Sequence, residues 1–252
     1  MKKISRVSIA LFVFVFAGAL IATAPATLLA KVVEGVSNGQ FVLANTTGTM
    51  WKGVATPAIR QRSGSLLALE KLHWDIAILP LFTGKIVTQL NWDNVEQVQP
   101  MLVTISFSQI ELRNVLIPLH AGVLGEVTPM LQPVQLSGQM QIKSDQLLFT
   151  REGVKGDAVA DWLNAGSVLS AVNPLGSYRI NLTGAGERLD VSLLTMSGAL
   201  LLEGKGSLKR NQGLSFQITA RAAAENKESL KELLNNLGPE STPGVHTLSL
   251  MR

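Results

Sequence analysis

The sequence has no cysteine, few aromatic residues and only three histidines among its 252 residues. The lack of cysteine excludes disulfide bonds, thiolate metal sites and cysteine nucleophiles, although it does not fix the compartment, because many exported proteins also lack cysteine. Aromatic residues make up 5% of the chain, and no basic stripe is interleaved with them. Nucleic-acid recognition depends on such a stripe, so we predict no nucleic-acid partner.

Acidic residues are absent from the first 31 positions, which carry four of the 22 lysines and arginines. The rest of the chain has 18 basic and 18 acidic residues, so the formal net charge of +4 comes from the amino terminus alone. Residues 32–252 are therefore electrically balanced, and they are numerous enough to bury a sizeable core.

Charged residues are also absent from residues 7–30, and Lys2, Lys3 and Arg6 precede this apolar run. A helix of about 20 apolar residues spans a bilayer, and leading positive charges keep its amino terminus in the cytoplasm. We therefore expect residues 1–31 to form a cytoplasmic tip and a single-pass membrane anchor, with residues 32–252 exported.

A cleaved signal peptide is the alternative interpretation of this segment. Ala22-Thr23-Ala24 resembles a cleavage site, and the apolar region is only slightly too long for a signal core. Pro25 directly follows that site and argues against cleavage, as does the continuation of the uncharged run to Ala30. An uncleaved anchor is favoured, and the body is exported under either interpretation.

Strict alternation of apolar and polar residues predicts that most of the body is β-structure. Trp74 lies at the centre of one such segment, residues 72–78, and residues 86–92 repeat the pattern after a turn region at residues 80–84. A period of two indicates a strand with one buried face and one wet face. The two segments therefore predict a hairpin with tryptophans on its apolar side.

The same alternation recurs along the rest of the body. Its other segments are residues 41–43, 103–107, 136–143, 178–182, 189–193 and 214–221. So many half-polar strands indicate an antiparallel sheet that exposes one side. The alternation changes phase near Ser108 and Gln109, which predicts a β-bulge there. Residues 94–100 are polar and predict a loop or a short helical turn, and prolines interrupt any long helix in residues 115–134.

One helix is clear near the carboxyl terminus, where leucines form a stripe that Gly238 and Pro239 end. A closing strand to Arg252 is expected after it. The predicted fold class is mainly β: an amino-terminal transmembrane helix, then a curved, largely antiparallel sheet as a meander or open half-barrel, with one clear carboxyl-terminal helix.

A weak internal similarity concerns Trp74 and Trp162, each of which precedes a Pro-Leu turn and an alternating strand. Two divergent repeats, about residues 40–135 and 136–252, would explain it, and so would chance. The four tryptophans also allow two interpretations. They could form a platform for a sugar or lipid, but packing in the core is favoured because Trp74 and Trp92 lie on apolar parity.

The polar residues show no pattern typical of a metal or catalytic site. His73, His120 and His246 are far apart and lack metal-ligand spacing, and His73 is expected at the surface. Residues 35–39, Gly-Val-Ser-Asn-Gly, match the nucleophile elbow, but the next element is predicted to be a strand and the elbow requires a helix. We therefore interpret residues 35–39 as a loop.

Two glycine pairs and two aspartates are further candidates for binding or catalysis. Gly184-Ala185-Gly186 and Gly204-Lys205-Gly206 lack the spacing and the helix of a phosphate loop, and we interpret them as turn glycines. Asp157 and Asp161 are expected to be solvated. The sequence therefore predicts no enzyme, no catalytic residue, no cofactor and no metal.

Four short motifs, in this order and spacing, resemble the general secretion pathway protein N family of bacterial type II secretion systems. They are Gly48-Thr49-Met50-Trp51-Lys52-Gly53, Leu72-x-Trp74-x-Ile76, Pro174-Leu175-Gly176-Ser177-Tyr178 and Gly198-Ala199-Leu200-x-Leu202-x-Gly204-x-Gly206. The resemblance covers about residues 7–250. The motif positions that we expect to be structural are Gly48, Thr49, Trp51, Gly53, Trp74, Pro174, Leu175, Gly176 and Tyr178.

The resemblance implies an accessory component anchored in the inner membrane through residues 7–30, with a periplasmic body that supports the export of folded proteins across the outer membrane. Implied partners are other secretion components, namely the outer-membrane secretin and the inner-membrane platform. The alternative hypothesis is an envelope lipid-binding or lipid-transfer module, because apolar positions outnumber the helices available to cover them. A periplasmic hydrolase ranks last, since the sequence offers no credible nucleophile.

Overall fold

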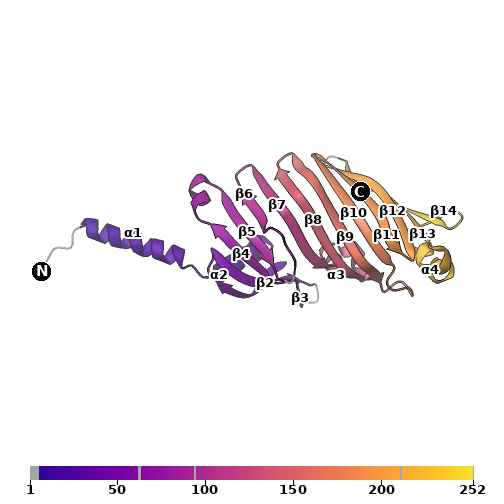
Figure 1. The fold of residues 1–252 in the computed structure, drawn as a ribbon, viewed down its shortest axis with the longest axis horizontal. Helices are drawn as coiled ribbons and strands as arrows, with labels where there is room; N and C mark the ends of the chain where they lie inside the picture. Colours follow the sequence, from indigo (N-terminus) through magenta and orange to yellow (C-terminus); the bar gives the residue numbers. More distant parts are fainter. Residues whose placement is uncertain (1–5, 62–63, 94, 211, 252) are drawn as a thin grey trace.

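The computed structural model describes residues 6–61, 64–93, 95–210 and 212–251, and one elongated sheet runs through almost the whole molecule (Figure 1). Lys2, Lys3, Asn94 and Arg252, on which parts of the predictions above depend, lie outside the described residues. The amino-terminal helix extends from one end of the sheet, and the last helix lies at the other end (Figure 1).

The apolar amino-terminal run forms two helices, α1 (Arg6–Ala22) and α2 (Ala26–Val36). The expectation of one helix through residues 7–30 is wrong, because the chain is extended at Pro25, which makes an isolated bridge to Thr49. Proline disfavours helical backbone in the residue before it, and the Ala24 carbonyl accepts from the Met50 N–H instead. In the described part of the chain, no helix combines the length and apolarity needed to cross a membrane.

The sheet is an antiparallel meander in which, apart from β3, each strand pairs with the next along the chain until β13. Its strands are β1 (Phe41–Gly48), β2 (Lys52–Arg60), β4 (Leu72–Ala77), β5 (Ile86–Trp92), β6 (Met101–Ile105), β7 (Gln109–His120), β8 (Leu136–Thr150), β9 (Gly153–Ser167), β10 (Gly176–Gly186), β11 (Arg188–Gly198), β12 (Leu200–Lys209), β13 (Gly213–Ala222), β15 (Val245–Met251) and β14 (Glu240–Thr242). The short β3 (Leu66–Ala68) pairs with β2 beside this path. The mainly antiparallel β prediction is confirmed.

The connections hold the remaining helical segments. They are the 3-10 turns η1 (Leu79–Thr83), η2 (Pro129–Val134) and η3 (Ala224–Asn226), and the helices α3 (Gly122–Val127) and α4 (Lys227–Leu237). Helix α4 is the predicted carboxyl-terminal helix, and Gly238 follows its last residue as expected. Residues 115–134 contain the end of β7, α3 and η2, in agreement with the absence of a long helix.

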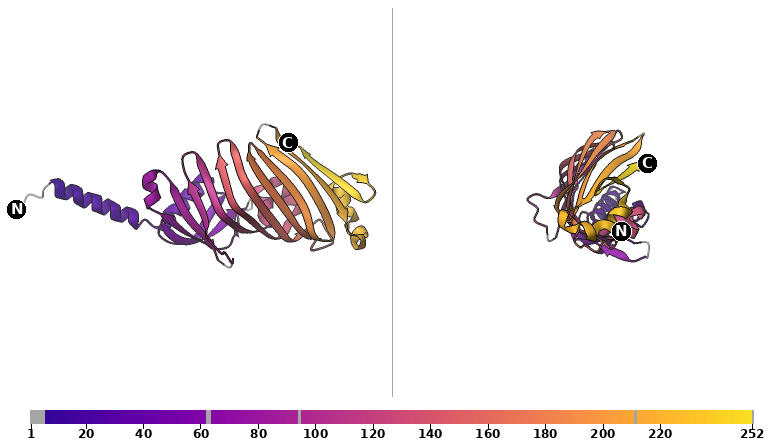
Figure 2. Two further views of the ribbon diagram at one scale, coloured as in Figure 1. Left: turned by 45° about the horizontal axis from the view of Figure 1, so that its top comes forward. Right: turned by 90° about the vertical axis from the view of Figure 1, so that its right-hand side faces the viewer.

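The sheet has one apolar face that is continuous across the strands. Ile76 faces Thr88, which faces Val103, and the row continues through Leu112 and Leu147. Farther along, Trp162 and Tyr178 lie on this same face, opposite one another on β9 and β10. In the end-on view the sheet curves around helical segments at both ends (Figure 2). We call this side the concave face and the other the convex face.

The register corrects one local prediction and confirms another. The phase change near Ser108 is the β6–β7 turn and not a bulge, because Ile105 pairs with Ile110 across it. When an even number of residues separates the paired ends of a hairpin, as the four between Ile105 and Ile110 do, the alternation changes phase just as it does at a bulge. Sequence alternation alone therefore does not separate the two. The tryptophan hairpin of β4 and β5 is confirmed.

The glycines at 204 and 206 are also not turn glycines, because both lie inside β12. The ring of Phe216 on β13 packs over them, and a Cβ on Gly204 would lie 2.9 Å from that ring. These positions therefore supply room for an aromatic side chain on the neighbouring strand.

Candidate functional site

The first motif, Gly48 to Gly53, connects the amino-terminal helices to the sheet. The Trp51 indole N–H donates to the Ile21 carbonyl at 2.8 Å, and the Met50 N–H donates to the Ala24 carbonyl at 2.7 Å. Gly48 has φ +93°, and a Cβ there would lie 2.6 Å from the Lys52 carbonyl oxygen. The motif thus forms a tight β1–β2 turn that holds the end of α1.

Trp74 packs directly against this turn from β4. Its side chain is buried, and its indole N–H donates to the Met50 carbonyl at 3.0 Å. A Cβ on Gly53 would overlap the six-membered ring of Trp74, so only glycine leaves space for the indole there. Ala26 of α2 and Ala55 of β2 complete the buried cluster. The tryptophan belongs to the packed core at this end of the sheet.

The third motif, Pro174 to Tyr178, occupies the other end of the concave face. Leu175 and Tyr178 are buried, and the Tyr178 hydroxyl donates to the Leu200 carbonyl at 2.9 Å. Burial raises the pKa of the Tyr178 phenol above its ordinary value. Pro174 is exposed and follows a cis peptide bond, while Gly176 pairs with both Ala165 and Gly198.

A cavity of about 280 Å³ lies between this motif and α4. Its walls are mostly apolar and come from β8, β9, β10, β12, β13, β15 and α4. The side chains that line it include Trp162, Tyr178, Leu202, Ala220, Leu233 and His246. We call this space the α4 cavity. It is the concave-face hollow that motif residues Leu175 and Tyr178 help to form.

His246 is the buried histidine of this cavity, with 7% of its surface exposed. It lies on β15 opposite Ala220, and its Nδ1 is 2.9 Å from the Gly238 carbonyl oxygen. A carbonyl oxygen only accepts, so Nδ1 carries the proton and donates. The sequence did not single out His246 as part of a site, because its position under α4 follows from the path of the whole sheet.

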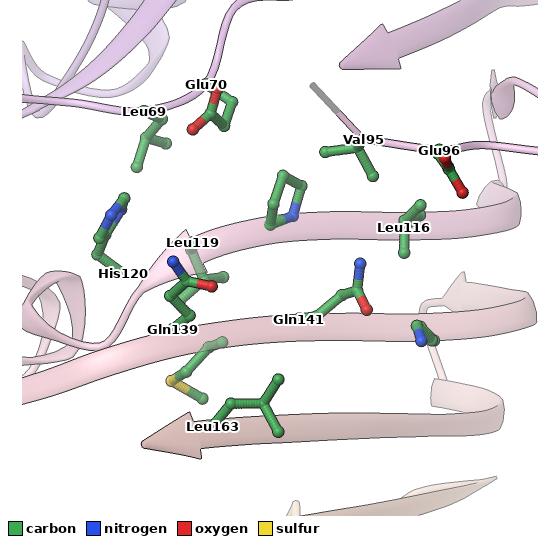
Figure 3. Close-up of a pocket in the computed structure, with 13 residues that line it drawn as sticks. Leu69, Glu70, Val95, Glu96, Leu116, Leu119, His120, Gln139, Gln141 and Leu163 are labelled. Carbon is green, nitrogen blue, oxygen red and sulfur yellow. The ribbon is translucent and has the colours of Figure 1, made fainter. Parts of the chain in front are cut away.

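The convex face carries a second and larger hollow of about 530 Å³ (Figure 3). In Figure 3, Glu70, Val95 and Glu96 approach from loops, while Leu116, His120 and Gln141 extend from the β7 and β8 strands beneath them. The charged groups there are exposed or half-exposed. Among the described residues, no group of three or more His, Asp and Glu side chains could hold a metal ion.

The remaining polar residues singled out above make structural contacts. His73 is half-exposed and lies 2.8 Å from Asp93, on the convex side as predicted. Arg179 donates two hydrogen bonds to Asp161, at 2.7 and 3.0 Å, and these lower the pKa of that carboxyl. Ser37 directly follows α2, and its hydroxyl accepts from the Phe41 N–H, so residues 35–39 do not form a nucleophile elbow.

The fold and the motif contacts define a class: a long antiparallel meander with an apolar concave face, a glycine-tryptophan turn at one end and a helix-covered cavity at the other. A family model for type II secretion system protein N matches residues 40–249. The chain therefore belongs to the type II secretion system protein N family. This assignment supports an accessory role in type II secretion and a location in the bacterial envelope.

Comparison with curated proteins and with solved structures gave no significant match. The family is one of secretion components and is not known for enzymatic activity. The matched range starts beyond α2, so it includes all four motifs that suggested the family and does not include the apolar helices.

Proposed function

We propose that this protein is an accessory subunit of the type II secretion machinery, tethered to the inner membrane by its amino-terminal apolar segment, with its sheet in the periplasm. The family match over residues 40–249 is the observation that carries this proposal. The apolar surface of α1 supports the tether, since Phe12 and Phe14 are 69% and 78% exposed. An apolar side chain in that position is stabilised by lipid rather than by water.

The attachment of α1 to the first motif supports an uncleaved segment. Residues near the cleavage-like site are bound to the body, because the Ile21 and Ala24 carbonyls accept from Trp51 and Met50. Amino-terminal sequencing of the protein from the membrane fraction tests this. A mature terminus after Ala24 would exclude the tether.

The contact with other secretion components is proposed to use strand addition at β1. Within the described chain, β1 has a strand neighbour on one side only. A free strand edge offers unpaired N–H and C=O groups to a partner strand. The outer-membrane secretin and the inner-membrane platform are the proposed partners.

Deletion of the gene, followed by measurement of exoproteins in the medium and in the periplasm, tests the pathway role. We expect exoprotein to accumulate in the periplasm under high secretion load and export to recover on complementation. Unchanged export under that load would refute the role. A photo-crosslinker at exposed Asn45 on β1 should capture a secretion component, whereas one at exposed Gln217 on the convex face serves as the matched control.

A second candidate function, envelope lipid binding, is favoured by one observation. The apolar face continues across the sheet, while only α2 and α4 form buried hydrophobic clusters with it among the described helices. A groove of this kind accommodates acyl chains. Lipid extraction and mass spectrometry of the gently solubilised protein should find stoichiometric lipid, and lipid-free protein would exclude this function.

A further inference from the structure

The α4 cavity has the composition of a small-molecule site. Its volume of about 280 Å³ is near the lower end of the range for such sites, and its lining is apolar with few polar groups. Leu200, Leu202, Ile218 and Leu248 line it from the sheet, and Leu233 and Leu237 from α4. An aliphatic chain would gain hydrophobic free energy from these walls, and one chain fits this volume better than two.

Two hydroxyl groups in the lining of the cavity already form hydrogen bonds within the protein. The Tyr178 hydroxyl donates to the Leu200 carbonyl, and the Ser167 hydroxyl donates to the Val134 carbonyl at 2.6 Å while accepting from the Leu169 N–H. These groups already have partners inside the protein. They do not require a ligand.

His246 is the exception. Its Nδ1–H donates to the Gly238 carbonyl, so Nε2, on the far side of the ring, carries the lone pair in the neutral tautomer. Within the residues that the structure describes, Nε2 makes no hydrogen bond, although the side chain is more than nine-tenths buried, and the atom itself is not among the fully inaccessible polar atoms that lack a partner. Nε2 is therefore an accessible acceptor in a mostly apolar cavity, and a ligand hydroxyl that reaches it can donate a hydrogen bond to it.

We propose that the α4 cavity binds one single-chain amphiphile, with its aliphatic chain against the leucine walls and a hydroxyl of its head group donating to Nε2 of His246. Exposed Asn236 of α4 also lines the cavity and offers a polar surrounding for the head group. This proposal rests on the second candidate function and names its site and ligand class.

Trp162 allows ligand binding in the α4 cavity to be measured by tryptophan fluorescence. It lines the cavity, whereas Trp51, Trp74 and Trp92 lie on or near the first strands at the opposite end of the sheet. A monoacylglycerol brominated along its chain quenches only tryptophans that it touches. Titrated into the solubilised full chain, it should quench part of the fluorescence saturably, and Trp162→Phe should lack that component. Equal quenching in the wild type and Trp162→Phe would overturn the site.

Two matched variants test the binding mode. His246→Asn retains a donor near the position of Nδ1 and removes the Nε2 acceptor, so affinity for the brominated probe should fall about 3- to 10-fold. Ala220→Leu fills the cavity and should abolish saturable quenching, whereas Thr219→Leu on the other face of β13 should not. Unchanged affinity in both His246→Asn and Ala220→Leu would refute the proposal.

The outcome also separates this proposal from the function on which it rests. Lipid that copurifies with the protein but fails to quench Trp162 would support the groove and refute the α4 cavity as its site. A lipid-free protein that also shows no quenching would refute both. Urea unfolding midpoints of the variants identify any loss of binding that comes from unfolding alone.

Discussion

Glycines of the family motifs lie where a side chain would overlap a neighbouring tryptophan ring or the backbone. Gly53 leaves space for the Trp74 ring, and Trp74 in turn donates to the Met50 carbonyl of the same turn. The sequence placed Trp74 on the apolar side of its strand, and the structure agrees. It could not show which glycine lies beneath the ring, because that depends on the β2–β4 register.

Gly53→Ala should destabilise the protein by about 1–3 kcal/mol, since the added methyl group overlaps the Trp74 ring in a packed core. Urea unfolding followed by tryptophan fluorescence measures this. Gly35→Ala is the control, because nothing lies within 4 Å of a Cβ at that helical position. Its stability should be unchanged or raised by up to about 1 kcal/mol. Equal effects of the two changes would contradict the role assigned to Trp74.

Tyr178→Phe should cost about 1–3 kcal/mol at neutral pH, because the Leu200 carbonyl loses its donor inside the core. The same variant tests the raised pKa of the phenol. A pKa raised by folding gives stability that is complete below the unfolded value of about 10 and is lost as pH rises above it. The wild type should therefore lose its advantage over Tyr178→Phe above about pH 10. A constant difference from pH 8 to 11 would contradict this.

At the scale of elements, α4 and α2 have equivalent roles at the two ends of the sheet. Helix α4 buries Leu230, Leu233 and Leu234 against Leu175, Leu200 and Ala220. Its leucine spacing predicted both the helix and its buried side. The same reasoning missed α2, because its first five residues belong to the uncharged run at residues 7–30, which also satisfied the pattern of a membrane anchor.

Leu230→Ala should destabilise the protein by about 2–5 kcal/mol, since this side chain is fully buried and its removal leaves a void. Lys231→Ala on the exposed side of the same helix should change the free energy of unfolding by less than about 0.5 kcal/mol. Thermal unfolding of the two variants compares them directly. Equal melting temperatures of the two variants would show that the packing of α4 on the sheet does not stabilise the protein.

On the scale of the whole molecule, the sheet divides apolar and polar side chains between its two faces. On β11, Leu193 is buried on the concave face, and the neighbouring Ser192 lies on the convex face, where Asn181 donates to its hydroxyl. The half-polar alternation in sequence predicted this division correctly. It follows from the period of two in every strand.

Leu193→Asp should therefore cost about 3 kcal/mol or more, because the carboxylate is buried without a partner. Ser192→Asp should be nearly neutral, since water and the facing Lys205 surround it. Circular dichroism during urea unfolding measures both. Similar losses for the two variants would show that the concave face does not exclude water as described.

The hypothesis of two divergent repeats stays a proposal, and one pair of contacts supports it. The indole of Trp74 donates to a carbonyl 24 residues before it, and that of Trp162 to the Ser137 carbonyl 25 residues before it, both at 3.0 Å. The sheet itself is continuous across the proposed boundary, because β7 and β8 pair from Gln109 to His120.

The sequence by itself determined the antiparallel sheet, the apolar side of the strands that alternate strictly, α4 and the family, since each depends on local periodicity or short motifs. Strands β2, β9 and β12 were not predicted from alternation. Only the tertiary structure decided that Pro25 divides the apolar run, that Ser108 lies in a turn, and that His246 lines the same α4-covered cavity as Trp162 and Tyr178. These features depend on strand register and on contacts between residues far apart in the chain. The period of two determines which face of the sheet a side chain occupies. The register of the paired strands determines which side chains are its neighbours on that face.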